Sequence, residues 1–219
     1  MAPRGASDVS RAELSFLSEH FARKDEDDDA TFYEPPRMVH HLDEPARTAL
    51  TSFYTGILPG QARVLDLMSS WVSHLPEMTF QEVSGLGMNA AELEANPVLT
   101  ARYVQDLNAD PVLPFDDASF DACLIALSVQ YLTRPSEVFA EIGRVLVSGG
   151  VCAVSFSNRC FPTKAVAVWR ALDDSGHIGL VTTYLRQADL FEEPVYADLS
   201  PHPGRSDPLF VVTAKRNGH

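Results

Sequence analysis

The chain has 219 residues, of which 45% are apolar, so it is long enough to fold as one domain with a sizeable core. Its formal net charge is −13, which argues against binding to a nucleic-acid backbone or to an anionic membrane surface. The three cysteines are widely spaced and predict neither a disulfide framework nor a zinc site, so we expect free thiols in a reducing compartment.

The first 30 residues are polar and charged, and the run Asp25–Asp29 contains only acidic side chains. Such runs are usually solvated, so we expect residues 1–30 to form a flexible acidic arm. The apolar side chains of the stretch Leu14–Phe21 predict one short amphipathic helix within this arm.

Residues 31–60 are predicted to form a lid segment followed by a helix. Two prolines in Phe32–His41 exclude a helix there, so we expect an extended segment that lies across the domain. Asp43 as the N-cap and Pro45 in the first turn then predict a helix that runs to about Tyr54.

Strands and helices alternate over the remaining residues, 61–219. The apolar runs predict strands at 63–67, 79–83, 101–105, 120–127 and 151–157. Amphipathic or capped stretches predict helices at 89–94, 135–148, 161–172 and 184–191. Two late strands, 194–199 and 209–214, are joined by a loop too short for a crossover helix, so they should pair antiparallel. This alternation predicts an α/β fold with a doubly wound, Rossmann-like sheet of seven strands, mostly parallel with an antiparallel last hairpin.

The run Arg63–Trp71 contains the most informative motif, because an apolar strand ends on Asp66 and the chain then turns sharply. In an open α/β sheet a ligand binds beyond the carboxyl ends of the strands, at the point where the strand order reverses. Residues that follow other strands, at 87–89, 106–107 and 127–128, should meet Asp66 there. We therefore predict one ligand-binding crevice at this edge of the sheet.

Two further stretches complete the pattern: Leu113–Asp121, which reads Leu-Pro-Phe-Asp-Asp-Ala-Ser-Phe-Asp, and Glu141–Gly150, which reads Glu-Ile-Gly-Arg-Val-Leu-Val-Ser-Gly-Gly. Together with Arg63–Trp71 they resemble the class I S-adenosylmethionine (SAM) dependent methyltransferases, in particular the methyltransferase 11 type, over Val64–Lys215. The resemblance implies a methyltransferase-like domain over residues 61–219, SAM as the cofactor and a small molecule as the methyl acceptor.

The resemblance also implies which residues contact the cofactor. Asp66 matches the acidic residue near the amino-acid part of SAM, with a helix N-cap as its alternative role. Asp106 matches the residue that accepts a hydrogen bond from the adenine amine, with a surface turn as its alternative, and Leu107 would offer its backbone N–H to the ring. The residues assigned to the cofactor are Asp66, Met68, Ser69, Ser70, Gly87, Asn89, Asp106, Leu107 and Leu127.

The chain departs from the family at two cofactor contacts. The three glycine positions of the first turn hold Met68, Ser70 and Val72. Gly87 stands where the family has the carboxylate that holds the ribose hydroxyls, and Asn89 or Glu82 could replace it. These departures keep a second hypothesis open, a non-catalytic member of the fold that serves as a partner subunit or a ligand sensor. An NAD(P)-binding oxidoreductase is less favoured, since no Gly-x-Gly-x-x-Gly follows a predicted strand.

Candidates for the acceptor side come from the lid and from the end of the fourth strand. His40, His41 and Tyr131 are candidate bases that would take a proton from an oxygen or nitrogen acceptor. Because neighbours in extended chain point to opposite faces, only one of the two histidines should face the pocket. Arg37, Gln130 and Tyr131 are candidates for substrate binding, with surface or core packing as their alternatives. The histidine pair lacks the spacing of a metal site, so none is predicted.

The expected location follows from the absence of two signals. The N-terminus lacks the apolar core of a secretory signal, and no apolar stretch approaches the length of a membrane-spanning helix. We therefore expect a cytoplasmic protein, with an organellar location left open, that binds a small molecule and neither nucleic acid nor membrane. The sequence defines neither the oligomeric state nor the acceptor.

Overall fold

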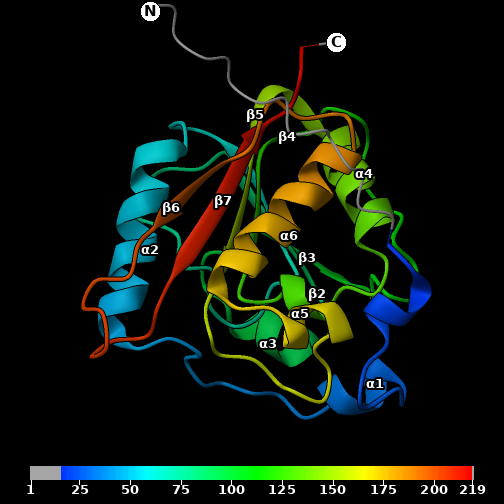
Figure 1. The fold of residues 1–219 in the computed structure, drawn as a ribbon. Helices are drawn as coiled ribbons and strands as arrows, with labels where there is room; N and C mark the ends of the chain where they lie inside the picture. Colours follow the sequence, from blue (N-terminus) through cyan, green and yellow to red (C-terminus); the bar gives the residue numbers. More distant parts are fainter. Residues whose placement is uncertain (1–15, 219) are drawn as a thin grey trace, which may run out of the picture.

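A computed structural model describes residues 16–218 and contains one seven-stranded sheet in the order β3-β2-β1-β4-β5-β7-β6 (Figure 1). The strands are β1 (Arg63–Leu67), β2 (Glu82–Gly87), β3 (Ala101–Val104), β4 (Phe120–Ala126), β5 (Leu146–Phe156), β6 (Val195–Asp198) and β7 (Phe210–Lys215). Strands β1 to β5 pair in parallel, whereas β7 pairs antiparallel with both β5 and β6. The predicted sheet, with its antiparallel last hairpin, is confirmed.

Helices cover both faces of this sheet. They are α1 (Asp29–Tyr33), α2 (Glu44–Ile57), α3 (Ala90–Ala95), α4 (Pro135–Val145), α5 (Ala167–Ala171) and α6 (Asp174–Gln187), with 3-10 turns at Ser18–Phe21 and Val129–Tyr131. Side chains alternate along β4, so that Ala122 and Leu124 pack with the α2 core while Cys123 and Ile125 pack with the core of α4 and α6. This alternation explains why the central strand is apolar throughout. No described helix has the length and apolar character needed to cross a membrane.

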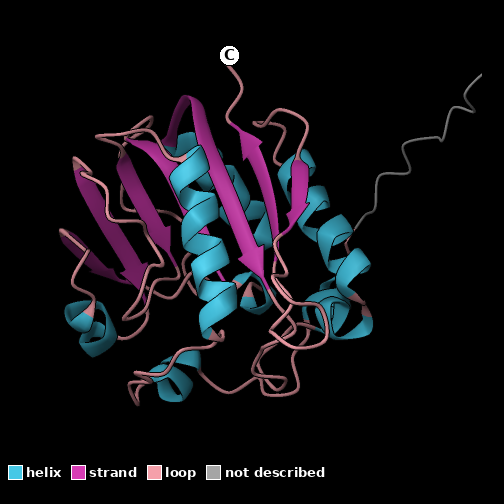
Figure 2. Ribbon diagram, turned by 90° about the vertical axis from the view of Figure 1, so that its left-hand side faces the viewer, coloured by secondary structure: helices cyan, strands magenta, loops and turns pink. Residues whose placement is uncertain are grey.

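The parallel strands end at one common edge, where their arrowheads point in Figure 2. The chain between β1 and β2, residues 68–81, forms no helix and reaches β2 as irregular structure. Strand β2 therefore begins at Glu82, paired with Arg63, and not at residue 79 as expected. Asp43 caps α2 through its side chain, which accepts a hydrogen bond from Ala46 N, as the sequence predicts.

Three predicted helix boundaries are wrong. The helix expected at 161–172 shortens to α5, and the one expected at 184–191 is the end of α6, which begins at an Asp173 cap. Two glycines inside α6 lower its helical propensity and conceal it in the sequence. Helix α4 ends at Val145, and the Gly149-Gly150 pair lies within β5, where Gly149 has a φ of 76°.

The acidic run is exposed at residues 26–28 but ends on a buried carboxylate, Asp29. Asp29 is 4% exposed, and both of its carboxylate oxygens accept hydrogen bonds from Arg23 Nη1, at 2.7 and 2.6 Å. Lys164, which is fully buried, lies 3.1 Å from Asp29 and donates to the Asp27 carbonyl at 2.7 Å. Hydrogen bonds from Arg23, Asn108 and Lys164 hold the pKa of Asp29 below its ordinary value, although burial acts in the opposite direction.

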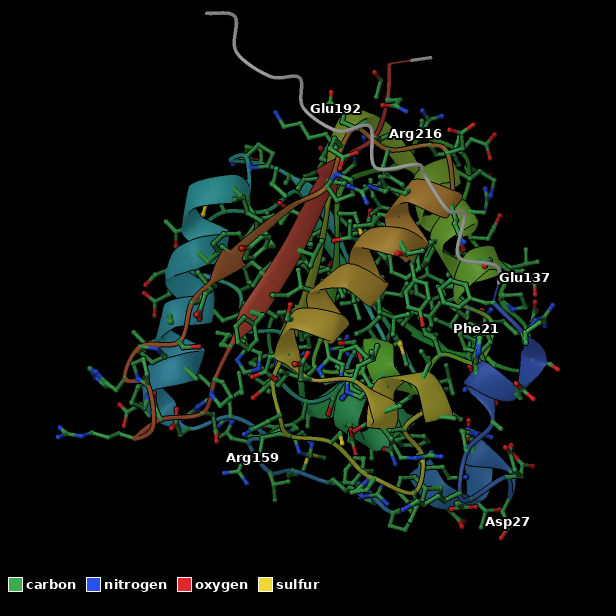
Figure 3. The ribbon with its side chains drawn as sticks, viewed as in Figure 1. Phe21, Asp27, Glu137, Arg159, Glu192 and Arg216 are labelled. Carbon is green, nitrogen blue, oxygen red and sulfur yellow. The ribbon has the colours of Figure 1, made fainter. Side chains whose placement is uncertain are left out.

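These contacts fix a segment that we call the strap, residues 22–43. Figure 1 shows it passing beneath the sheet from α1 to α2, along the edge where the parallel strands end. Figure 3 places Asp27 of the strap and Arg159, which follows β5, at this same edge. Before the strap, the described part of the short helix predicted near Phe21 is a 3-10 turn, Ser18–Phe21, and Phe16 and Phe21 pack against Tyr184 of α6; Leu14 lies outside the described residues.

Candidate functional site

A cavity of about 550 Å³ lies between the strap and the carboxyl ends of the parallel strands. Its lining comes from the turns that follow β1, β2, β3 and β4 and from the strap itself. The position is the one where the strand order reverses, because β1 lies between β2 and β4. A volume of this size is typical of a small-molecule site.

Asp66 is the most deeply buried acidic side chain of the cavity lining, at 2% exposure. The hydroxyls of Ser69 and Ser73 donate to its Oδ2, at 2.5 and 2.6 Å. Burial raises the pKa of Asp66 to about 6, and these two hydrogen bonds lessen the rise. Since residues 68–81 contain no helix, Asp66 caps none, and that alternative is wrong.

The turn after β1 occupies the space in front of Gly87. Met68 has a φ of 57°, and Ser69 N donates to the Leu86 carbonyl at 2.8 Å, so the turn runs along the end of β2. A Cβ atom on Gly87 would lie 2.2 Å from the Ser69 carbonyl oxygen. A side chain at Gly87 is therefore incompatible with this turn, because the Ser69 backbone fills the space in front of it.

Asn89 and Glu92 join the cavity to the strap. Asn89 caps α3 through its Oδ1, and both protons of its amide are engaged by the carbonyls of Tyr33 and Glu34, each at 2.9 Å. One lone pair of Oδ1 is all that remains for a ligand. Glu92 accepts from Arg37 N at 2.6 Å and from the Ser70 hydroxyl at 2.5 Å. Glu92 thus links the turn after β1 to the strap.

The turn after β3 holds Asp106, Leu107 and Asn108. Asp106 is half-buried, and its Oδ1 accepts from Asn108 N at 2.8 Å. The Asn108 amide donates to Asp29 and to the Tyr131 carbonyl, each at 3.0 Å. Leu107, between them, is buried. This side of the cavity is therefore built from fixed groups.

The end of β4 brings a polar atom without a partner to the cavity. Ser128 is buried and lines the cavity, and its hydroxyl has no hydrogen-bond partner among the described residues. The preceding Leu127 also lines the cavity and has a φ of 58°. Gln130 is 1% exposed, donates to the Leu127 carbonyl at 2.8 Å and is not part of the lining. The structure therefore does not bring Gln130 to the cavity.

Aromatic rings gather at the strap side of the cavity around Phe161. Tyr131 stacks on Phe161 at 5.9 Å between ring centroids, and its hydroxyl accepts from Phe161 N at 2.8 Å. His41 meets the same ring edge-on at 5.6 Å. Arg37 places its guanidinium carbon 5.3 Å from the Phe161 centroid. The sequence reasoning missed Phe161, because it follows β5 in a loop with no motif.

Both histidines of the strap line the cavity, which corrects the expectation that only one faces it. The chain from 34 to 43 is bent and not extended as a strand, so neighbours need not alternate. His40 stacks on Trp71 at 4.6 Å, and the indole donates to the Val39 carbonyl at 3.1 Å. Desolvation lowers the pKa of His40 and of His41; for His41 Glu92 opposes this effect and Arg37 adds to it.

His74 completes this group of rings at the cavity. Burial, and then the charge of Arg47, lower the pKa of His74 to about 4. All three imidazoles are therefore neutral at pH 7. Within residues 16–218, no three His, Cys, Asp or Glu side chains are arranged to hold a metal ion.

Comparisons with known proteins agree on the class of fold. Residues 69–154 match a family model described as a methyltransferase domain. A 66-residue stretch is 36% identical to the biotin biosynthesis bifunctional protein BioHC of Teredinibacter turnerae. That stretch is 30% of this chain and 12% of the relative, so the similarity covers a small part of a longer protein.

Solved structures extend the likeness over most of the chain. An S-adenosylmethionine-dependent methyltransferase from Mesorhizobium loti superposes with a TM-score of 0.53 at 16% identity, over 77% of this chain and 98% of that one. The [4+2]-cyclase SpnF superposes with a TM-score of 0.56 at 15% identity, over 84% of this chain and 89% of that one. At these identities the likeness concerns the fold alone. The second structure is named a cyclase, so proteins of this fold are not all named methyltransferases.

Proposed function

We propose that this chain, a member of the class I SAM-dependent methyltransferase superfamily by its fold and its matching family model, transfers a methyl group from SAM to a small molecule. The observation that carries the proposal is the cavity at the reversal of strand order, where Asp66, Asp106 and Ser128 come together. SAM is the cofactor that the matches imply. When bound, it supplies the reactive methyl group on a sulfonium, so the chain mainly has to bind and orient.

The polar groups of the cavity suit SAM on two sides. The Asp106 carboxylate would accept from the adenine amine, with the Leu107 backbone N–H directed to the ring. Asp66, ionised, would pair with the amino group of the methionine part. The unpartnered Ser128 hydroxyl supports the presence of a polar ligand, because a buried hydroxyl without a partner is costly.

The ribose side suits SAM less well. Gly87 offers no carboxylate, and Asn89 retains one lone pair, so we expect affinity below that of family members with the acidic residue. A hydrogen bond to a charged group contributes about 1.5–3 kcal/mol, so the expected loss is roughly tenfold to a hundredfold.

We assign the strap side of the cavity to the acceptor. His41 lies against Phe161, beside Tyr131, and is our candidate for the base, with His40 as the alternative. A neutral imidazole can take a proton from an oxygen or nitrogen acceptor at pH 7. His41→Ala should lower turnover about a hundredfold or more and leave SAM affinity nearly unchanged.

The second candidate function is a non-catalytic member of the fold that acts as a partner subunit or a ligand sensor. The observation that favours it is the Ser69 carbonyl, which fills the space at Gly87 where the family binds ribose. The two candidates differ in whether SAM binds at all.

Titration calorimetry with SAM and with S-adenosylhomocysteine, its demethylated product, tests the proposed function. Wild type should bind both, and Asp106→Ala should weaken binding about tenfold or more. Asp116→Ala, which removes an exposed carboxylate outside the cavity, is the matched control and should bind as wild type does. Absence of heat at millimolar ligand would favour the non-catalytic candidate, and unchanged binding in Asp106→Ala would remove Asp106 from the site.

A further inference from the structure

Arg37 brings a cation to the cavity that no carboxylate neutralises. Its Nη2 donates to the Phe32 carbonyl at 2.7 Å and its Nη1 to the Pro35 carbonyl at 3.4 Å. Among the described residues no carboxylate lies within ion-pair distance of its guanidinium, although the chain has 30 acidic residues. A guanidinium has five N–H donors, so most of them remain for a ligand.

The carboxylates that share the cavity are engaged elsewhere. Asp29 is paired with Arg23 and Lys164. Asp207 is paired with Arg159 at 2.9 Å. The remaining acidic groups of the lining accept from hydroxyl or backbone donors; they are Asp43, Asp66, Glu92 and Asp106. A ligand therefore meets one guanidinium without an ion-pair partner on the strap side, and carboxylates whose oxygens already accept hydrogen bonds from the protein.

Aromatic rings surround this cation. The guanidinium carbon lies 4.5 Å from the Phe32 centroid, 5.8 Å from that of Tyr33 and 5.3 Å from that of Phe161. Tyr131 extends the apolar surface by stacking on Phe161. Rings hold the guanidinium in place and limit its contact with water, which strengthens its attraction for an anion. Tyr33, Tyr131 and Phe161 also line the cavity, so a ligand there meets aromatic side chains beside the guanidinium.

We propose that Arg37 binds the carboxylate of the methyl acceptor, and that the acceptor is a small planar aromatic acid. A guanidinium matches a carboxylate through two parallel hydrogen bonds, while the ring of such an acid would lie against Phe161. A dianion such as a phosphate ester is disfavoured, because one cation faces it in a chain of net charge −13. The identification of this acid as the methyl acceptor rests on the proposed function. The binding of an aromatic carboxylate at Arg37 does not depend on that function.

Calorimetry with three isosteres, benzoate, benzamide and benzamidine, tests the charge requirement on the full chain. Wild type should bind benzoate at least tenfold more tightly than neutral benzamide or cationic benzamidine. Acetate should bind more weakly than benzoate, because it lacks the ring. Equal affinity for benzoate and benzamide would overturn the anion site, and equal affinity for benzoate and acetate would overturn the aromatic part.

Variants locate the effect at one residue. Arg37→Gln should weaken benzoate binding about tenfold or more, and Arg37→Lys should give an intermediate loss, because it keeps the charge without the two-pronged geometry. Arg205→Gln removes the same charge from an exposed position outside the cavity and should bind benzoate as wild type does. An equal loss in Arg205→Gln, or no loss in Arg37→Gln, would contradict the proposal.

S-adenosylhomocysteine binding on the same samples separates this inference from the proposed function. Retained S-adenosylhomocysteine affinity in Arg37→Gln shows that the variant is folded and that the loss is confined to the acceptor side. Benzoate binding by wild type without any S-adenosylhomocysteine binding would sustain the anion site and defeat the methyltransferase proposal. If Arg37→Gln does not fold, Arg37→Lys decides, and benzoate affinity unchanged in that variant would overturn the two-pronged contact.

Discussion

Two regions of the molecule show opposite relations to the family pattern. In residues 113–156, Arg144 binds Glu141 at 2.7 Å and Asp117 at 2.7 Å and donates to the carbonyls of Leu113 and Phe115. In residues 66–81, Met68, Ser70 and Val72 stand at the three glycine positions, Met68 takes a positive φ and no helix follows β1. The first region joins β4, α4 and β5 and fits the family motifs, whereas the second lines the cavity.

This comparison indicates that the stretches that best match the family, at 113–121 and 141–150, stabilise the fold and do not line the cavity. The contacts of Arg144 hold a loop to a helix and would be the same for any ligand. The turn after β1 instead decides what can lie beside Gly87 and is held by Glu92 and by Asp66. We therefore expect substitutions that alter the ligand or its affinity to fall in residues 66–81, and those in residues 113–156 to affect mainly stability.

The largest expected effect is at Gly87. Gly87→Asp places a carboxylate at the end of β2, where the proposed function expects the ribose, yet we expect it to impair the protein, because its Cβ would lie 2.2 Å from the Ser69 carbonyl. Overpacking against backbone and burial of a charge should lower the free energy of unfolding by about 3 kcal/mol. Thermal denaturation should show a melting temperature lower by about 6–12 °C, with SAM affinity reduced.

The matched control for that variant is Gly60→Asp, since a Cβ on Gly60 would meet no atom within 4 Å. It should melt close to wild type. If Gly87→Asp has the stability of wild type and binds SAM more tightly, the turn at 68–70 can move away from position 87 at little cost. The two regions would then not differ in the way described above.

The second effect concerns Asp66 and depends on pH. Its folded-state pKa of about 6 lies above the ordinary 3.8, so the folded state binds the proton more tightly and loses stability as the pH rises from about 4 to beyond 6. The side chain of the Asp66→Asn variant is uncharged, like the protonated carboxyl group, and its amide oxygen can still accept hydrogen bonds from Ser69 and Ser73. At pH 7.5 it should therefore raise the free energy of unfolding by about 2–3 kcal/mol.

Melting curves of Asp66→Asn and wild type at pH 4 and pH 7.5 measure this difference. The variant should melt about 4–12 °C higher at pH 7.5 and level with wild type at pH 4. A lower melting temperature at pH 7.5 would mean that the ionised carboxylate stabilises the turn, against this account.

The third and smallest effect lies in the scaffold region. Arg144→Ala should lower the free energy of unfolding by about 2 kcal/mol, because a half-buried guanidinium loses several charge-assisted hydrogen bonds that solvent replaces in part. SAM affinity, measured by calorimetry, should stay within about twofold of wild type. Arg134→Ala removes an exposed helix pair with Glu137 and should leave the melting temperature unchanged. If Arg144→Ala lowers the affinity for SAM, the scaffold region also determines cofactor binding, and the two regions are not independent.

How far the sequence predicts this molecule follows the same division. The sheet and its last hairpin were predictable, because apolar runs and short loops are local signals in the sequence. The start of α2 was predictable for the same reason, since Asp43 is a typical N-cap residue. Asp66, Asp106 and Leu127 reach the cavity because each lies at or just beyond the carboxyl end of a parallel strand. Helix α6 was partly hidden by its glycines.

What the sequence could not supply are contacts between distant residues. The strap is fixed by Arg23, Asp29 and Lys164, of which the last lies 137 residues beyond its partner Asp27. Phe161 and Glu92 join the site through tertiary packing, and no motif marks them. Gln130 belongs to a segment that the sequence places correctly, but its side chain turns to the core, which sequence patterns do not specify.

A crystal structure of the protein with saturating S-adenosylhomocysteine would show whether the turn after β1 keeps its place against Gly87 when the cofactor product is bound. The account predicts the adenine beside Asp106 and Leu107, and the Ser69 carbonyl still against Gly87, with the ribose held by fewer hydrogen bonds than a carboxylate would give. A cavity that stays without S-adenosylhomocysteine, or a turn at 68–70 that moves away from Gly87 to admit it, would contradict the account.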